Sequence, residues 1–231
     1  MASAGFRHSK SGKTNWLFIS QAKLRRVRYT KQMLVVDCEM SGLDPQKNSL
    51  VSIGAIDFDN PTRQLYEECR VWEGAHIEDE ALAVNGFTRE QIVDSAKQSE
   101  ADAVHKFIAF AEGMADMTVA GQNVFTDDAF LRAATVRAGH TAWPFAHRIL
   151  DIHSICWTHM VKRGVAPPVD PIKKHTALNL TAVLAYCGIP EEPKPHNALT
   201  GAKCNAEVIS RLLYDKKLLP EFEQYEIPWL K

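Results

Sequence analysis

The sequence predicts a single α/β domain in which helices cover a mixed β-sheet. Three short apolar runs follow one another early in the chain, and helix-like and strand-like segments alternate after them. The 231 residues are enough for one large domain, and 45% hydrophobic with 24% charged residues is ordinary for a folded protein. No internal repeat or clear domain boundary interrupts this pattern.

The expected strands at the start of the sheet occupy residues 32–40 (QMLVVDCEM), 49–59 (SLVSIGAIDFD) and 64–72 (QLYEECRVW). Each run is rich in β-branched or aromatic residues, and the segment DNPT (59–62) is a suitable turn between the last two. Three strands in sequence at such short distances favour an antiparallel meander.

The alternating part begins with a helix at 99–114, whose apolar side chains share one face and whose first residue, Ser99, is a plausible cap. The other expected elements are strands at 118–123 and 147–152, and helices at 126–139, 152–163, about 177–187 and 198–214. A Pro-rich loop at 164–171 precedes Lys173 and Lys174, which either contact phosphate or are simply solvated.

A charge asymmetry marks the beginning of the chain. Eight Lys or Arg residues come before Asp37, the first acidic residue, which leaves −9 for the rest of a chain whose net charge is −1. We interpret residues 1–31 as a basic arm that attracts phosphate, with a plain tail and a targeting presequence as alternatives. Residues 32–215 form the expected domain, and 216–231 a C-terminal tail.

Membrane insertion and secretion are not expected, because the apolar runs are far shorter than about 20 residues and no cleavable leader opens the chain. Five scattered cysteines without a CxxC pair indicate free thiols, so we expect a cytoplasmic protein. His153, Cys156 and His159 have helical spacing, but no fourth zinc ligand is evident.

Asp37 and Glu39 are the first candidate site residues. They stand two positions apart on an expected strand, so both side chains leave the same face. Two like charges at the end of a buried apolar run are costly unless a cation neutralises them. Carboxylate oxygens of this kind suit Mg²⁺ or Mn²⁺.

Three further polar positions each have an ordinary structural explanation when taken alone. Asp127 lies at the start of an expected helix, where the helix dipole and capping favour an acid. Asn123 suits the turn before that helix, and His196 stands beside Asn197, a suitable cap for the last helix.

The order and spacing of these residues resemble the DEDD 3′–5′ exonucleases, specifically their histidine (DnaQ-like) branch, which includes ribonuclease T and oligoribonuclease. The DxE motif matches Asp37 and Glu39, and the stretch DCEMSGLDP is especially similar to oligoribonuclease. The motif G-x-N-x-x-F-D-x-x-F-L has Thr126 in place of its aromatic residue and otherwise matches Gly121, Asn123, Asp127, Phe130 and Leu131. The motif H-x-A-x-x-D-A matches His196, Ala198 and Ala202 but has Gly201 where its Asp belongs.

The resemblance covers about residues 32–215 and implies a ribonuclease H-like fold, with helices on both faces of a mixed central sheet. It also implies hydrolysis of DNA or RNA phosphodiester bonds from the 3′ end with two Mg²⁺ or Mn²⁺ ions. In this scheme Asp37 bridges both ions, Glu39 holds the first and Asp127 supports the second. His196 takes a proton from the attacking water. The implied substrate-binding residues are Asn123, Met40, Ser41, Gly42 and Leu43.

Gly201 stands where the family has a direct metal ligand, so weaker metal binding is expected. Asn205, one helical turn further on, could reach a metal only through water. Three interpretations stay open: an active exonuclease, a catalytically inactive form that binds 3′ ends, and a protein-interaction module.

The expected partner is nucleic acid with a free 3′ end, with single strands favoured. Homodimerisation is common in this branch. The tail residues Phe222, Tyr225 and Trp229 could serve a dimer interface, or could instead pack on their own domain.

Overall fold

The computed structural model describes residues 33–114 and 116–230, so the predicted basic arm lies outside the described residues. The strands are β1 (Leu34–Met40), β2 (Leu50–Asp57), β3 (Gln64–Glu68), β4 (Val119–Gly121) and β5 (Ile149–Asp151). The helices are α1 (Asp79–Asn85), α2 (Arg89–Val93), α3 (Glu100–Ala111), α4 (Phe125–Arg137), α5 (Ile152–Lys162), α6 (Leu180–Cys187) and α7 (Ala198–Tyr214). Two 3₁₀ turns follow, η2 (Pro220–Phe222) and η3 (Pro228–Leu230).

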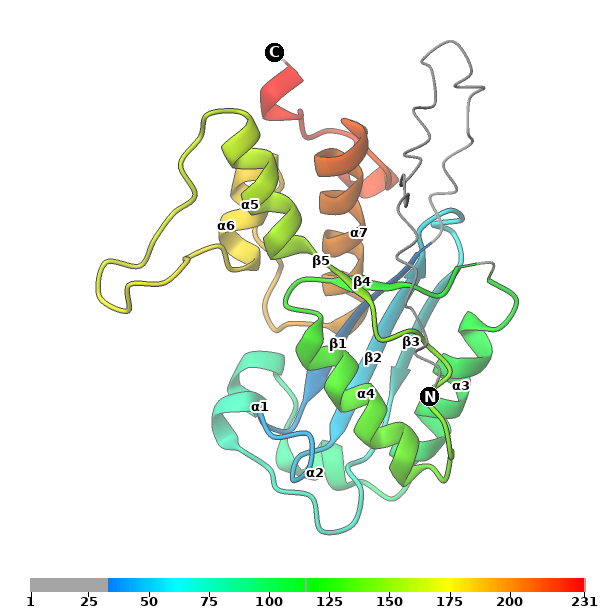
Figure 1. The fold of residues 1–231 in the computed structure, drawn as a ribbon. Coiled ribbons are helices and arrows are strands. Elements are labelled where there is room, and N and C mark those ends of the chain that lie inside the picture. The colour runs from blue at the N-terminus through cyan, green and yellow to red at the C-terminus, as the bar shows by residue number, and fades with distance from the viewer. Residues whose placement is uncertain (1–32, 115, 231) are drawn as a thin grey trace, which may run out of the picture. The chain divides into compact units, whose positions relative to one another are not determined.

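The strands form one mixed sheet in the order β3-β2-β1-β4-β5 (Figure 1). Strands β1, β2 and β3 are joined as an antiparallel meander, whereas β4 pairs in parallel with both β1 and β5. The predicted mixed sheet and meander are therefore confirmed.

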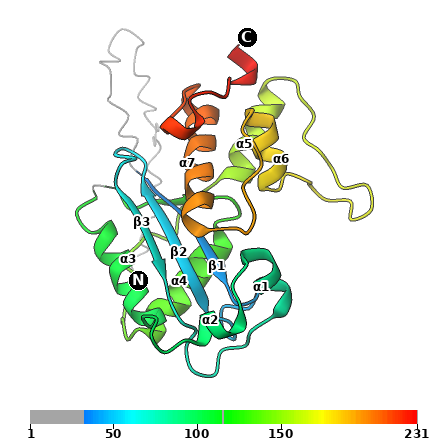
Figure 2. The same cartoon turned by 180° about the vertical axis from the view of Figure 1, so that it is seen from behind.

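Helices cover both faces of this sheet, as predicted (Figure 2). Successive side chains of a strand point to opposite faces, so Val35 joins the core formed with α5, α6 and α7, while Leu34 and Val36 join the core formed with α3 and α4. Asp37 and Glu39 have the parity of Val35. They consequently lie on the sheet face that α7 covers.

The predicted caps of two helices are confirmed. The Ser99 hydroxyl accepts from the Asp102 N–H in a capping box, and the Asn197 side chain accepts from the N–H groups of Leu199 and Thr200. The short helices α1 and α2 were not predicted. Helix α2 begins with its own capping box, in which Thr88 accepts from the Gln91 N–H.

A buried ion pair in the second half of α7 fixes the C-terminal tail. The Arg211 guanidinium donates to Glu207 at 2.7 Å, and both side chains are fully buried. Arg211 also donates to the carbonyl oxygens of Cys187, Phe222, Tyr225 and Glu226. The tail therefore packs on its own domain, and homodimerisation stays a prediction.

The other sequence-based expectations concern cysteines and membranes. All five cysteines are buried and free. The two histidines considered for zinc contact hydroxyl groups instead: His153 with Thr176 Oγ1 at 3.0 Å and His159 with Tyr186 OH at 2.8 Å. Within residues 33–114 and 116–230, no helix combines the length and apolarity that a membrane span needs.

Candidate active site

Strand β1 brings Asp37 and Glu39 to a place where the sheet is incomplete. Its partner β4 is short and pairs only with Leu34 and Val35, so the second half of β1 has a free edge on that side. The Cys38 N–H on this edge donates to Asp127 Oδ1 at 2.9 Å. Three predicted site carboxylates are thus joined at one end of β1.

Asp127 reaches β1 from the first turn of α4 rather than capping its own helix. The N-cap of α4 is Val124, which has no side-chain cap, and the Asp127 carboxylate is directed at Cys38. Asn123, just before this helix, has φ of 49°, a left-handed conformation that asparagine tolerates better than most residues. Asp127 therefore lies in the first turn of its helix, as predicted, but its carboxylate is not the N-cap of that helix.

Helix α7 lies unusually close to β1 and β2, and glycines make this possible. A Cβ atom added at Gly54 of β2 would lie 2.1 Å from the Ala198 carbonyl oxygen. A Cβ added at Gly201 would lie 2.2 Å from Asp37 Oδ2 and 3.3 Å from Asp37 Cβ. The Asp37 carboxylate thus occupies the space that the Cβ atom of an acid at position 201 would need.

His196 enters the site just before α7. Its backbone N–H donates to the Val84 carbonyl at the end of α1, and its Nδ1 lies 3.9 Å from Glu192 Oε2. Glu192 was not predicted as a site residue. It is a buried carboxylate in the loop between α6 and α7, and its neighbours Glu191 and Pro193 are exposed.

The site is strongly acidic. Burial raises the pKa of Asp37 well above its usual range, and the charges of Asp127, Glu39 and Glu192 raise it further. Burial, followed by the charges of Glu192 and Asp127, raises the pKa of Glu39 to about 8. Burial raises the pKa of Asp127 to about 7 against the opposing hydrogen bond from Cys38. Burial also raises the pKa of Glu192, partly offset by His196. Burial is the first cause of each shift, and no Lys or Arg of the described residues forms an ion pair with these carboxylates to offset it.

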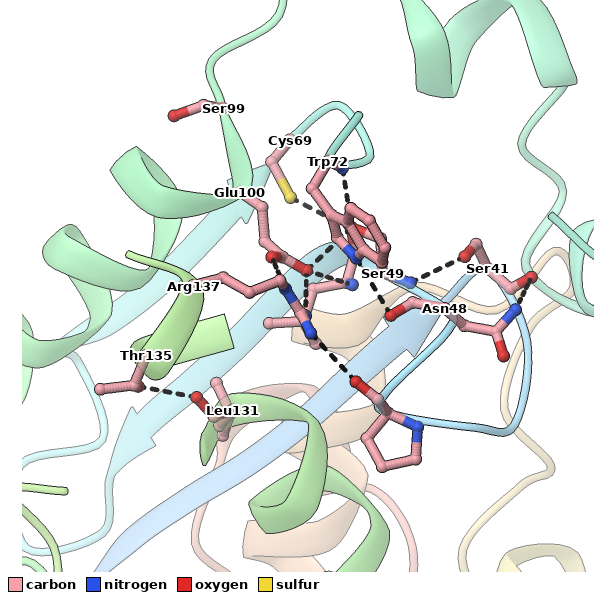
Figure 3. Close-up of polar contacts among 12 residues, drawn as sticks. Ser41, Asn48, Ser49, Cys69, Trp72, Ser99, Glu100, Leu131, Thr135 and Arg137 are labelled. Atoms are coloured by element: carbon pink, nitrogen blue, oxygen red, sulfur yellow. Dashed lines mark hydrogen bonds and ion pairs between the residues drawn. The ribbon is translucent and has the colours of Figure 1, made fainter. Parts of the chain in front are cut away.

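The buried carboxylate of Glu100 anchors the loop that follows β1 (Figure 3). Glu100 Oε1 accepts from Ser49 Oγ at 2.8 Å and from the Leu50 N–H at 2.9 Å. Arg137 donates to both Glu100 oxygens and also to the Pro45 carbonyl at 3.0 Å. One ion pair therefore fixes both the middle and the end of this loop.

The predicted substrate-binding residues in that loop differ in exposure. Ser41 is fully buried, and its hydroxyl donates to the His76 carbonyl at 2.8 Å. Gly42 is buried against Asn48 and Glu78, so a Cβ there would overlap both side chains. Met40 is partly buried against the α3–α4 core, whereas Leu43 is 83% exposed. Of these four residues, Leu43 is the one whose side chain is open to solvent.

Asn123 lies at an open pocket of about 490 Å³. His153, Lys173 and His175 line the same pocket. The structure thus brings Lys173, for which a phosphate contact was considered, together with a predicted substrate-binding residue. The N–H groups of both Ile172 and Lys173 donate to Asp170, which orders this part of the loop.

The residues present suit a divalent metal ion, although no three His, Cys, Asp or Glu side chains of the described residues already stand as a ready-made ligand set. Buried oxygens without a hydrogen-bond partner in this part of the chain include Glu192 Oε1 and Asn205 Oδ1. Buried polar atoms are normally paired, and carboxylate and amide oxygens are ligands that Mg²⁺ and Mn²⁺ accept. An unbalanced acidic cluster with free oxygens therefore fits such an ion.

Comparison with known proteins agrees with this geometry. The exonuclease family typified by ribonuclease T matches residues 34–209. Ribonuclease T of Yersinia enterocolitica is 30% identical over 125 residues, which cover 48% of this chain and 58% of that protein. Ribonuclease T of Cronobacter sakazakii is 28% identical over 179 residues, 68% of this chain and 80% of that protein. The chain thus spans just over half the length of the Yersinia relative.

Solved structures show the same fold at low sequence identity. The E. coli Exonuclease I structure in complex with a dA16 oligonucleotide has a TM-score of 0.60 and 16% identity, covering 79% of this chain and 42% of that one. The nuclease domain of 3′hExo, a DEDDh family member bound to rAMP, has a TM-score of 0.61 and 17% identity, covering 83% and 96%. These structures show the shared fold, and the family match over residues 34–209 shows that the chain belongs to the exonuclease family typified by ribonuclease T, within the DnaQ-like 3′–5′ exonuclease superfamily.

Proposed function

We propose that this protein is a metal-dependent 3′–5′ exonuclease that acts on single-stranded DNA or RNA. The observation that carries the proposal is the meeting of Asp37, Glu39 and Asp127 at the free edge of β1, beside the loop that bears His196. Three acids without cationic partners are costly in a protein that does not bind a cation.

Asp37, Glu39 and Asp127 are the residues that would hold Mg²⁺ or Mn²⁺. Two such ions, when bound, stabilise the negative charge on the attacking and leaving oxygens of the phosphodiester. Holding ions requires the Asp37 carboxylate to turn away from Gly201, which its side-chain torsions allow.

His196 is the proposed general base. Its side chain is about one-third exposed, so water reaches it, and Glu192 on its Nδ1 side leaves Nε2 free to take a proton. A water molecule activated there would attack the last phosphodiester of a strand.

The substrate end has two supporting features. Leu43 is an exposed apolar side chain on a loop fixed by Glu100 and Arg137, and it would pack against the terminal base. The pocket lined by Asn123, Lys173 and His175 has the cationic and amide donors that suit a phosphate.

The test is the shortening of 5′-labelled single-stranded DNA and RNA in Mg²⁺ and in Mn²⁺. The wild-type chain should produce a ladder from the 3′ end. Asp37→Ala should lower the rate on the order of a thousandfold or more, because one of the residues that would hold the metal ions is lost. Asp59→Ala is the matched control, since Asp59 is an exposed acid in the turn after β2.

Two outcomes oppose the proposal in different ways. If the wild-type chain binds labelled strands in a salt-sensitive manner but never shortens them, the protein is an inactive 3′-end binder. If it neither binds nor cuts them, the fold serves as an interaction module.

A further inference from the structure

Glu192 is a buried carboxylate whose burial the fold does not explain. Its side chain is only 5% exposed, although the residues on either side of it, Glu191 and Pro193, are exposed. Burying a carboxylate costs several kcal/mol unless it is paired or binds a metal. Because the residues before and after Glu192 are already exposed, a small change in the loop could expose Glu192 as well.

The contacts of Glu192 compensate for this burial only in part: the charge of His196 and a hydrogen bond from the Asn197 backbone N–H lower the pKa of Glu192, but burial raises it by more. Among the described residues, Oε1 has no hydrogen-bond partner, and Oε2 has His196 Nδ1 at 3.9 Å, which is beyond hydrogen-bonding distance. The side chain lies close enough to Asp37 and Glu39 for its charge to act on both. Glu192 is therefore directed into the acidic site with one oxygen free.

The site lacks an acid at position 201, where glycine has no side chain to bind a metal ion and where the Asp37 carboxylate lies instead. A Cβ at that position would stand 2.2 Å from Asp37 Oδ2. The next acid along the helix, Glu207, is already engaged by Arg211 and by the N–H groups of Leu218 and Leu219. A fourth carboxylate for the site must come from outside α7.

We propose that Glu192 supplies this fourth carboxylate, as a direct ligand of the metal ion that the family's missing Asp would hold. The inference rests on the proposed function, because it assumes a divalent ion between Asp37 and Glu39. It replaces a ligand on the first turn of α7 with one from the loop that leads into it. The free Oε1 atom is the ligand oxygen.

The experiment is a titration of the full-length chain with Mn²⁺, followed by calorimetry and by the electron paramagnetic resonance of free Mn²⁺. Glu192→Gln should weaken one Mn²⁺ site by at least about tenfold. Glu191→Gln, which changes the exposed neighbour, should bind as the wild type does. Asp37→Ala should lose the high-affinity binding altogether.

Two more variants separate a ligand from other roles. If Glu192 only orients His196, then His196→Ala and Glu192→Gln should both keep the wild-type Mn²⁺ affinity, and the inference is wrong. If Glu192 only adds negative charge nearby, Glu192→Asp should bind as tightly as the wild type, which also overturns it. The inference expects Glu192→Asp to bind more weakly, because its oxygens are withdrawn by one methylene.

The two proposals fail differently. Wild-type affinity in Glu192→Gln together with lost binding in Asp37→Ala rejects the role of Glu192 and leaves the metal site standing. Absence of Mn²⁺ binding in the wild-type chain rejects both. Unfolding curves in EDTA show whether each variant is folded, and Glu192→Gln should be at least as stable as the wild type because a buried like charge is removed.

Discussion

The two halves of α7 bury charged residues in opposite ways. In the second half, Glu207 and Arg211 form an ion pair at 2.7 Å, and their remaining oxygens and N–H groups are taken up by backbone atoms of the tail. Facing the first half, Asp37, Glu39 and Glu192 have no Lys or Arg partner among the described residues. One helix thus contributes an ion pair with balanced charges and, about two turns earlier, packs against a cluster of acids whose charges are not balanced.

The paired charges of the second half stabilise the fold, whereas the unpaired acids that face the first half destabilise it. A buried pair with all its hydrogen bonds made holds its surroundings together, and removing one member leaves the other stranded. A group of like charges lowers stability until a counterion arrives. Opposite responses to the removal of a charge are therefore expected from the two halves of α7.

The largest effect is expected from Arg211→Ala, which should lower the free energy of unfolding by about 3–5 kcal/mol. Glu207 would be left buried without its cationic partner, and three tail carbonyls and the Cys187 carbonyl would lose their donor. Urea denaturation in EDTA measures this. Arg163→Ala is the control, because Arg163 also donates to the tail but is exposed, and a loss below about 1 kcal/mol is expected there. Similar losses in both variants would contradict the structural role of Arg211.

Glu100→Gln should lower the free energy of unfolding by an intermediate amount, about 1–3 kcal/mol. Glu100 and Arg137 form a second ion pair with balanced charges, which this change removes. The same variant should raise KM with little change in kcat, since the loop carrying Leu43 loses its anchor. Glu112→Gln, an exposed change at the end of α3, is the control. An unchanged KM in Glu100→Gln would show that the loop keeps its shape without this carboxylate.

An effect of opposite sign is expected in the acidic cluster, where removing a charge should raise stability. The pKa of Glu39 is raised from 4.5 to about 8, so the folded chain keeps a proton that the unfolded chain releases, and metal-free stability should fall as the pH rises from about 4.5 to 8. Glu39→Gln should flatten this fall and raise metal-free stability near pH 8, because the neutral amide has no charge to bury. Urea midpoints in EDTA across this range test it, with the exposed Glu80→Gln as control. A steeper fall in Glu39→Gln would mean that the charge of Glu39 is compensated in the folded state.

Much of the fold could be predicted because its strands and long helices show clear periodicity. The apolar run ending in Asp37 and Glu39 gave β1, and the caps Ser99 and Asn197 marked helix starts. The helices α1 and α2 were missed because segments of seven and five residues are too short to show a repeating apolar face.

The site was predicted less completely, for reasons that are three-dimensional. Glu192 lies in a Pro-rich loop, where glutamate is ordinarily solvated, and its burial is seen only in the folded chain. Likewise, nothing in the sequence indicated that the Asp127 carboxylate would reach the Cys38 N–H, since that depends on β4 being too short to cover the edge of β1.

The close approach of α7 to β1 has a consequence for how this chain can change. Because Asp37 Cβ would lie 3.3 Å from a Cβ at position 201, the effect of any substitution of Gly201 depends on the rotamer of Asp37 and on the seating of the whole helix. Positions 37 and 201 are therefore expected to be epistatic, because the cost of adding a side chain at position 201 depends on where the Asp37 carboxylate lies.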